Sequence, residues 1–191
     1  MVTIYIEGGG HYPALRTACR QAFTEFFKKA GFAGKMPAPV ACGSRLEAYK
    51  KFRIAIDNGE NALLLVDSET AVNVQLKGED DKPETWQPWV HLAEREGDKW
   101  QKPDMASNQH CHLMVQCMEN WFLADRDVLI RFFANGFNEN RLPHQQTPIE
   151  SIEKTAVLTS LENASKNCKT KAKYGKGEHS FKILKEIDPN R

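Results

Sequence analysis

Three short apolar runs separated by two amphipathic stretches constrain the fold of this chain more than any other feature. Residues 2–6 and 40–43 are short β-branched or apolar runs, and residues 62–66 are continuously apolar. Between them, apolar side chains recur at three- and four-residue steps over 13–30 and 44–57, which is typical of helices. The order strand, helix, strand, helix, strand predicts a parallel sheet with right-handed crossovers. The continuous run over 62–66 predicts a strand that is covered on both faces.

The remainder of the chain extends this α/β unit. We expect a fourth strand over 111–116 and further helices over 86–96, 118–124, 125–133, 149–164 and 178–187. The chain is thus predicted to be a single domain, 1–191, with an α/β core over 1–125 and a helical, lysine-rich extension over 126–191. An insertion over 70–107 interrupts the core, and exposed loops are expected within it at 79–83 and 97–99. Because it holds three of the four tryptophans, part of it should pack against the core.

Composition excludes several classes of protein. Among 191 residues, 41% are hydrophobic and 27% charged, which is ordinary for a globular domain and argues against disorder or a coiled coil. A net charge of +1 excludes a uniformly basic DNA-coating protein. Apolar runs are too short for a membrane span, and the first residues lack the basic region of a signal peptide. The five cysteines form no Cys-x-x-Cys pair, so reduced thiols in a cytoplasmic protein are expected. The sequence leaves open whether the chain forms a homo-oligomer.

Acidic residues follow two of the predicted strands. Glu7 ends the first strand, and Asp67 and Glu69 come directly after the third. The carboxyl ends of parallel strands share one edge of a sheet, where ligands bind. Carboxylate oxygens there suit Mg²⁺ or Mn²⁺. The alternative is that Glu7 caps the first helix and the other two acids merely begin a loop.

Three glycines that follow Glu7 would let a phosphate approach the backbone closely: Gly8, Gly9 and Gly10. Glu119, just after the fourth predicted strand, is a candidate fourth metal ligand or else a surface residue. Arg45 begins the second helix, where it would contact phosphate or pair with Glu47 or Glu69.

Lysines gather near the end of the chain. Seven lie within 166–185 and only Glu178 opposes them there: Lys166, Lys169, Lys171, Lys173, Lys176, Lys182 and Lys185. Such a cluster suits a nucleic-acid backbone, although a solvated tail would have the same composition. Glycines flank Lys176, which would let its ammonium stabilise a phosphoryl group. His179 is a candidate phosphate ligand or proton carrier, or simply a residue of the last helix.

Several stretches resemble the TOPRIM domain of topoisomerases, primases and OLD-family nucleases. The chain looks most like a bacterial family of small TOPRIM-like proteins related to OLD-like and RloB-like proteins. The stretches that carry the resemblance are 5–10, 40–45, 64–69, 112–125 and 174–181.

The resemblance implies a four-stranded, Rossmann-like parallel sheet, with Glu7 as general base or metal ligand and Asp67 and Glu69 as metal ligands. Glu119 would hold a second metal, and Lys176 would neutralise developing charge. Glu69 departs from the usual second aspartate of the Asp-x-Asp pair, which puts the metal geometry in doubt.

The function that we expect is metal-dependent hydrolysis of DNA or RNA. Relatives of this type often act in phage defence beside an ATPase of the AAA or ABC type, so the resemblance also implies such a partner. One alternative is a non-catalytic module that uses the 70–107 insertion to dock onto an ATPase. A phosphotransferase or nucleotidyltransferase that uses the same acids is a third possibility.

Overall fold

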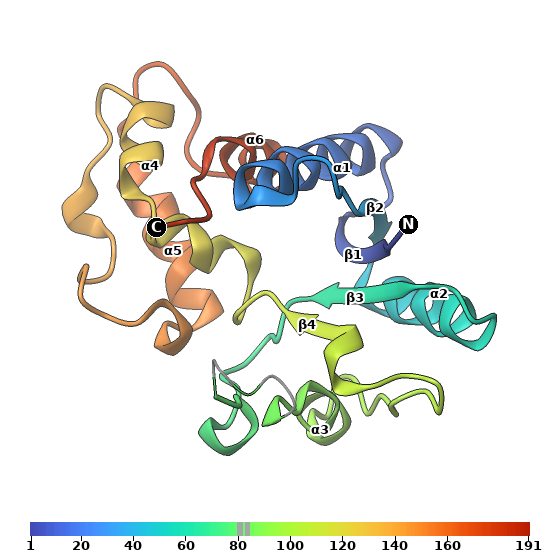
Figure 1. Ribbon diagram of the computed structural model, residues 1–191. Helices are drawn as coiled ribbons and strands as arrows, with labels where there is room; N and C mark the ends of the chain where they lie inside the picture. The colour runs from blue at the N-terminus through green and yellow to red at the C-terminus, as the bar shows by residue number, and fades with distance from the viewer. Residues whose placement is uncertain (80–81, 83–84) are drawn as a thin grey trace.

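The computed structural model describes residues 1–79, 82 and 85–191. Four parallel strands form one sheet in the order β2-β1-β3-β4 (Figure 1). The strands are β1 (Thr3–Gly9), β2 (Ala38–Gly43), β3 (Ala62–Val66) and β4 (Cys111–Leu113). The expected four-stranded parallel sheet flanked by helices, with helices at the C-terminal end, is therefore confirmed as a Rossmann-like α/β fold.

Helices cover both faces of this sheet. On one face α1 (Pro13–Phe27) lies beside α6 (Lys176–Glu186), and on the other lie α2 (Arg45–Asp57) and α3 (Pro88–Glu94) (Figure 1). The helices α4 (Arg126–Phe133) and α5 (Lys154–Ser165) extend the first layer. The described residues also include 3₁₀ turns at Val74–Leu76, Asn108–His110, Met118–Leu123, Glu139–Arg141 and Ile149–Ser151 and a π turn at Lys28–Phe32.

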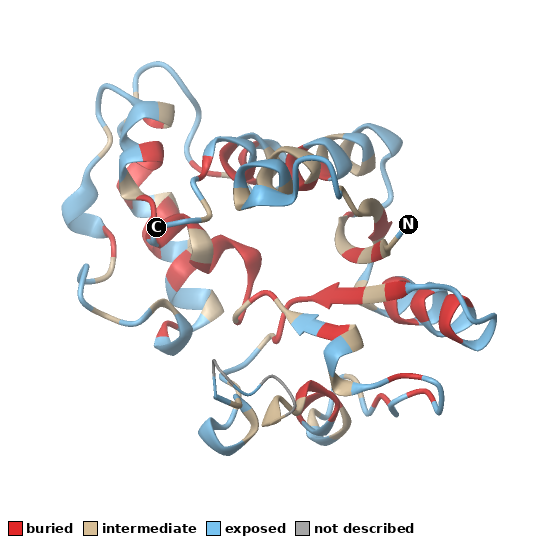
Figure 2. Cartoon of the chain, in the orientation of Figure 1, coloured by how far each residue is buried: buried red, intermediate tan, exposed pale blue. Residues whose placement is uncertain are grey.

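Two apolar cores lie on the two faces of the sheet. Phe23 of α1 is fully buried in the first core, and Phe52 of α2 is fully buried in the second. Strand β3 separates them, with Leu65 facing one core and Leu64 the other. Figure 2 shows the resulting burial along β3. The prediction that the continuous apolar run over 62–66 is a strand covered on both faces is thus confirmed.

Some boundaries differ from the prediction for reasons of backbone geometry. Strand β1 continues past Glu7 because Gly8 and Gly9 both pair with Gly43. Strand β4 ends at Leu113 instead of residue 116, since Val115 adopts a positive φ of 52°, which is outside the extended range of a residue with a side chain.

The helix expected from residue 149 also begins later. The segment Ile149–Ser151 is a 3₁₀ turn, the backbone at Glu153 is extended, and α5 begins at Lys154.

The 70–107 insertion packs against α2, as expected from its tryptophans. Trp100 stacks on Tyr49 with ring centroids 4.6 Å apart, and Trp89 stacks on Phe52 at 5.8 Å. The prediction that 97–99 is an exposed loop is wrong at Asp98, because the Asp98 side chain is only 1% exposed. The loop expected at 79–83 lies largely outside the described residues.

Candidate metal centre

The carboxyl ends of β1 and β3 bring three acids together. One carboxylate oxygen from each of Glu7, Asp67 and Glu69 lies within 4.8 Å of the others. The first two are linked directly, since the Asp67 backbone N–H donates to Glu7 Oε2 at 3.2 Å. The sequence prediction that these acids converge therefore agrees with the geometry. They form the acidic cluster.

Asp67 is the most enclosed member of the acidic cluster. Its side chain is almost fully buried, and its Oδ1 accepts a hydrogen bond from the Met118 N–H at 2.9 Å. Burial, with a smaller contribution from the Glu7 charge, raises the pKa of Asp67 to about 7. Burial also raises the pKa of Glu7, although the Arg45 guanidinium opposes this rise. Both carboxylates are thus disfavoured in their charged forms unless a cation compensates them.

An unusual backbone turn positions Glu69. Glu69 has φ 66° and Val115 has φ 52°, which places both in the left-handed region. This conformation is disfavoured for any side chain and most of all for a β-branched one. Two hydrogen bonds hold the paired segments there, from Ser68 N–H to Val115 O at 2.7 Å and from Glu69 N–H to Gln116 O at 2.9 Å. The sheet pairing therefore continues past the ends of β3 and β4 through a strained connection, a feature often found at functional sites.

Three basic side chains contact the acidic cluster. Lys154, the first residue of α5, places its Nζ 2.7 Å from Glu69 and 3.5 Å from Asp67. Lys176, the first residue of α6, lies 3.9 Å from Asp67. Burial lowers the pKa of Lys176, but the nearby Glu119 and Asp67 carboxylates outweigh burial and raise it, so the ammonium stays charged.

Arg45 is the third cation and is held in place by the insertion. Its guanidinium donates two hydrogen bonds to Asp98, at 2.8 and 2.6 Å, and lies over the Trp100 ring with 5.0 Å to the centroid. The same group lies 3.2 Å from Glu7 and 3.6 Å from Glu69. Of the two partners suggested by the sequence, Arg45 therefore pairs with Glu69, whereas Glu47 pairs with Lys50.

Glu119 lies beside the acidic cluster but is not one of its members among the described residues. It is completely buried, and its Oε1 accepts hydrogen bonds from Tyr174 at 3.1 Å and Ser180 at 2.9 Å. Its Oε2 has no hydrogen-bond partner in the described part of the chain, and the Lys176 ammonium lies 3.3 Å away. Glu119 is thus not the surface residue considered as an alternative, and Lys176 lies between it and Asp67.

The glycines after Glu7 form one wall of a cavity of about 250 Å³, which Asp67, Lys176 and Gly177 also line. Side chains are sterically excluded at Gly9 and at Gly43, which lines the same cavity, whereas a Cβ on Gly10 would meet nothing within 4 Å. A Cβ on Gly9 would come within 2.7 Å of Arg16 Cα, and one on Gly43 within 2.5 Å of Gly10 O. Gly9 and Gly43 therefore let α1 and β2 approach the end of β1, and Gly8, Gly9 and Gly10 line the cavity together with Glu7 and Asp67. Phosphate binding by these glycines stays a prediction.

Two residues predicted to bind phosphate are placed elsewhere. His179 is buried against Phe132 and Phe133, and its Nδ1 accepts the Gly175 N–H at 3.0 Å. Burial lowers the pKa of His179, which favours the neutral ring, so the structure argues against a phosphate ligand there. Lys173 pairs with Glu162 at 2.8 Å on the surface and does not line the cavity.

Four residues at the site escaped sequence reasoning: Lys154, Asp98, Tyr174 and Ser180. Lys154 reaches its partner Glu69 from 85 positions away. Asp98 lies in a Gly-Asp-Lys segment that has the composition of an exposed loop. Neither residue carries a local signal, because each depends on a long-range contact. Tyr174 and Ser180 flank Lys176 in sequence, so the Lys176 prediction could have prompted a search for them.

The residues present suit a hard divalent cation. The acidic cluster offers oxygen ligands alone, which is the donor set that Mg²⁺ and Mn²⁺ prefer. Buried Glu119 adds a further carboxylate beside the acidic cluster, and its Oε2, which has no hydrogen-bond partner among the described residues, pairs with the Lys176 ammonium. Glu7, Asp67 and Glu69 would hold such a cation, with Glu119 behind Lys176.

Comparisons with known proteins give a family for the chain. A family model described as Domain of unknown function (DUF4276) matches residues 6–191. No curated protein and no solved structure matches the chain. Within residues 1–79, 82 and 85–191, no helix is both long and apolar enough to cross a membrane.

Proposed function

This chain belongs to the family described as Domain of unknown function (DUF4276), and we propose that it hydrolyses phosphodiester bonds of nucleic acid with a divalent metal. The observation that carries this proposal is the convergence of Glu7, Asp67 and Glu69 to within 4.8 Å at the carboxyl edge of a parallel sheet. In open α/β sheets this edge is the usual place for a ligand.

The proposed chemistry assigns a role to each group. A bound Mg²⁺ or Mn²⁺ would polarise the phosphoryl oxygen and lower the pKa of a water molecule. Glu7 accepts the proton of the attacking water, for which a carboxyl with a raised pKa is suited. Lys176 stays protonated and neutralises the charge that develops on the phosphoryl oxygens. The backbone of Gly8, Gly9 and Gly10 borders the cavity in which that phosphate would lie.

The TOPRIM resemblance supports the proposal and extends it. The three acids that carry the resemblance are those that the fold brings together. As in OLD-like relatives, we propose a role in phage defence and an ATPase of the AAA or ABC type as partner. Such a partner would bind a surface that leaves the sheet edge open to nucleic acid.

The test is divalent-dependent cleavage by the purified protein. We expect wild type to cut DNA or RNA oligonucleotides in Mn²⁺, alone or with the ATPase, and to be inert in EDTA. The double variant Glu7→Gln/Asp67→Asn should be inactive. A matched control, Glu96→Gln/Asp104→Asn, changes two exposed acids and should retain activity. Equal behaviour of wild type and the Glu7/Asp67 variant under all of these conditions would refute the proposal.

One observation favours a second candidate, a non-catalytic module. Arg45, Lys154 and Lys176 already pair with the acidic cluster, so the charge of the acids is balanced within the chain without metal. The docking surface expected in the insertion is reduced, because Trp89 and Trp100 are buried within this chain. A melting temperature that does not rise with Mn²⁺ would favour the module, because a ligand that binds the native state must raise it.

A further inference from the structure

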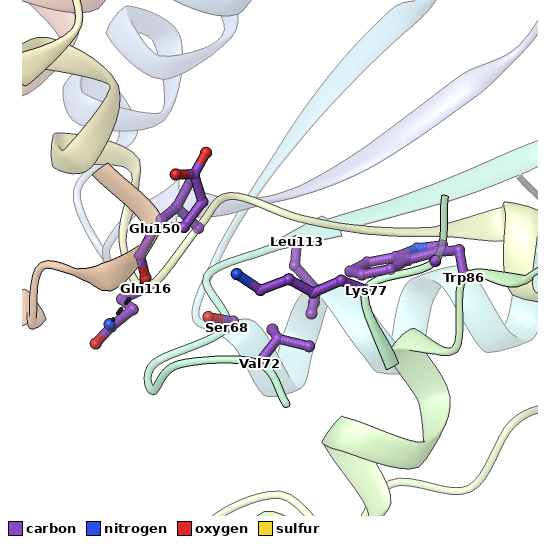
Figure 3. A pocket seen from close by; sticks show the side chains of 9 residues that line it. Ser68, Val72, Lys77, Trp86, Leu113, Gln116 and Glu150 are labelled. Atoms are coloured by element: carbon purple, nitrogen blue, oxygen red, sulfur yellow. Dashed lines mark hydrogen bonds between the residues drawn. The ribbon is translucent and has the colours of Figure 1, made fainter. Parts of the chain in front are cut away.

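A second cavity, of about 430 Å³, adjoins the acidic cluster on the insertion side of the sheet. Figure 3 shows its lining side chains, with Trp86 at one side and Gln116 and Glu150 at the other. Val72 and Leu113 add apolar walls, and Lys77 extends toward Ser68. The volume lies in the range of small-ligand pockets, and an aromatic face beside a few polar groups is their common lining.

The cavity and the acidic cluster are built from the same segments of chain. Ser68 lines the cavity and lies between Asp67 and Glu69, whose Cα atoms are each about 3.8 Å from its own. Gln116, which lines the cavity, accepts the Glu69 N–H at its backbone oxygen at 2.9 Å. Glu150 lines the cavity four residues before Lys154, whose Nζ lies 2.7 Å from Glu69. One segment thus contributes to both places, and two other segments that line the cavity are bonded to Glu69, so a ligand in the cavity lies beside the acidic cluster.

The cavity has a fixed aromatic wall. The Trp86 indole is half-buried and its Nε1–H donates to Cys111 O at 3.0 Å, which orients the ring against β4. Gln116 Nε2 donates to Glu150 O at 3.3 Å, which fixes the opposite side. The strained Val115 also lines the cavity. The backbone conformation that positions Glu69 therefore also shapes this cavity.

We infer that this cavity receives one base of the nucleic-acid strand whose phosphate lies at the acidic cluster. This inference rests on the proposed function. A base stacks on an aromatic face and offers hydrogen-bond groups at its edge, which matches Trp86 together with the Gln116 amide. The Lys77 ammonium would contact the sugar–phosphate of the same nucleotide. A base must leave its stack to enter, so the preferred substrate is single-stranded or locally unpaired.

The test separates the base from the phosphate. Wild type is titrated in EDTA, where cleavage cannot occur, with a fluorescent 12-nucleotide single strand and with an abasic strand of equal length. We expect the abasic strand to bind about tenfold more weakly. Trp86→Leu should bind the normal strand about as weakly as the abasic one, whereas Trp86→Phe, which keeps a stacking face, should retain most of the difference.

A structural role of Trp86 is controlled for in two ways. Phe and Leu both lose the indole hydrogen bond, so general destabilisation would affect both variants alike, as their melting temperatures would show. Lys77→Ala removes an exposed side chain and should weaken binding of both strands by a similar factor.

The outcomes distinguish this inference from the function on which it rests. If Mn²⁺-dependent cleavage occurs but neither Trp86→Leu nor base removal changes binding, the base pocket is refuted and the proposed function stands. If base-dependent binding is seen but no metal-dependent cleavage, the proposed function fails. Free mononucleotides that compete as strongly as the strand, per site, would also overturn the inference in favour of a nucleotide-binding pocket.

Discussion

At the scale of single residues, the site is defined by carboxylates held where water solvates them poorly. Asp67 and Glu119 are both buried, and Glu119 depends on Tyr174, Ser180 and Lys176 for compensation. Buried charge lowers stability unless it is paired. The chain thus retains an arrangement that is unfavourable for folding alone, which is expected of a functional site.

Asp67→Asn should stabilise the metal-free protein. Burial raises the folded-state pKa of Asp67 from the ordinary 3.8 to about 7, so the folded protein binds this proton more tightly than the unfolded chain. Ionised Asp67 therefore lowers stability increasingly from about pH 4 to about pH 7, and by a constant amount above that. In EDTA near pH 8 the variant should melt at a higher temperature than wild type, with the gap closing toward pH 4.

The control for this prediction is Asp104→Asn, an exposed acid, which should melt like wild type throughout this pH range. A variant at position 67 that melts below wild type at pH 8, or whose difference does not depend on pH, would contradict the account of Asp67.

At the scale of elements, the first residues of helices place cations at the sheet edge, and the insertion holds one of these cations in position. The helices α5 and α6 begin at Lys154 and Lys176, and the insertion holds Arg45 through Asp98. Each element also packs an apolar face against a core, so packing fixes where its charge lies. Changes in these elements should alter metal affinity and stability separately.

Lys154→Gln should increase metal affinity while it destabilises the metal-free protein. The Lys154 ammonium contacts Glu69 and Asp67, so it competes with a divalent cation for their oxygens. We expect a lower melting temperature in EDTA and a Mn²⁺ dissociation constant several-fold below that of wild type, measured by calorimetry. Lys166→Gln, at an exposed position of the same region, should change neither. Weaker Mn²⁺ binding by the Lys154 variant would show that the lysine supports the cation instead.

Asp98→Asn should destabilise the protein by about 3 kcal/mol, because it leaves the Arg45 guanidinium without its bidentate partner. For a chain of this length that is a fall in melting temperature of roughly 6–12 °C. Asp104→Asn, in the same insertion but exposed, again serves as the control. A fall of less than about 1 °C would indicate that the insertion does not anchor Arg45.

At the scale of the whole molecule, the sequence predicts the order of strands and helices, but it does not predict contacts between residues that are far apart in the chain. Alternating strands and helices give the parallel sheet, and the shared edge of such a sheet gives the convergence of Glu7 with Asp67 and Glu69. The partners Lys154 and Asp98 lie 85 and 53 positions from the residues they contact, so no local pattern marks them. The early end of β4 also escaped prediction, because an apolar valine gives no sign of a positive φ.

The central claim is that Glu7, Asp67 and Glu69 hold a divalent cation. The most direct measurement is an anomalous difference map from crystals of the protein soaked in Mn²⁺. The account predicts a peak bounded by carboxylate oxygens of these three residues, and its loss in Glu7→Gln/Asp67→Asn. The claim would be contradicted by a map that shows Mn²⁺ elsewhere but no peak at the acidic cluster. It would also be contradicted if Arg45 and Lys154 still paired with the cluster at saturating Mn²⁺ and no ion lay between its acids.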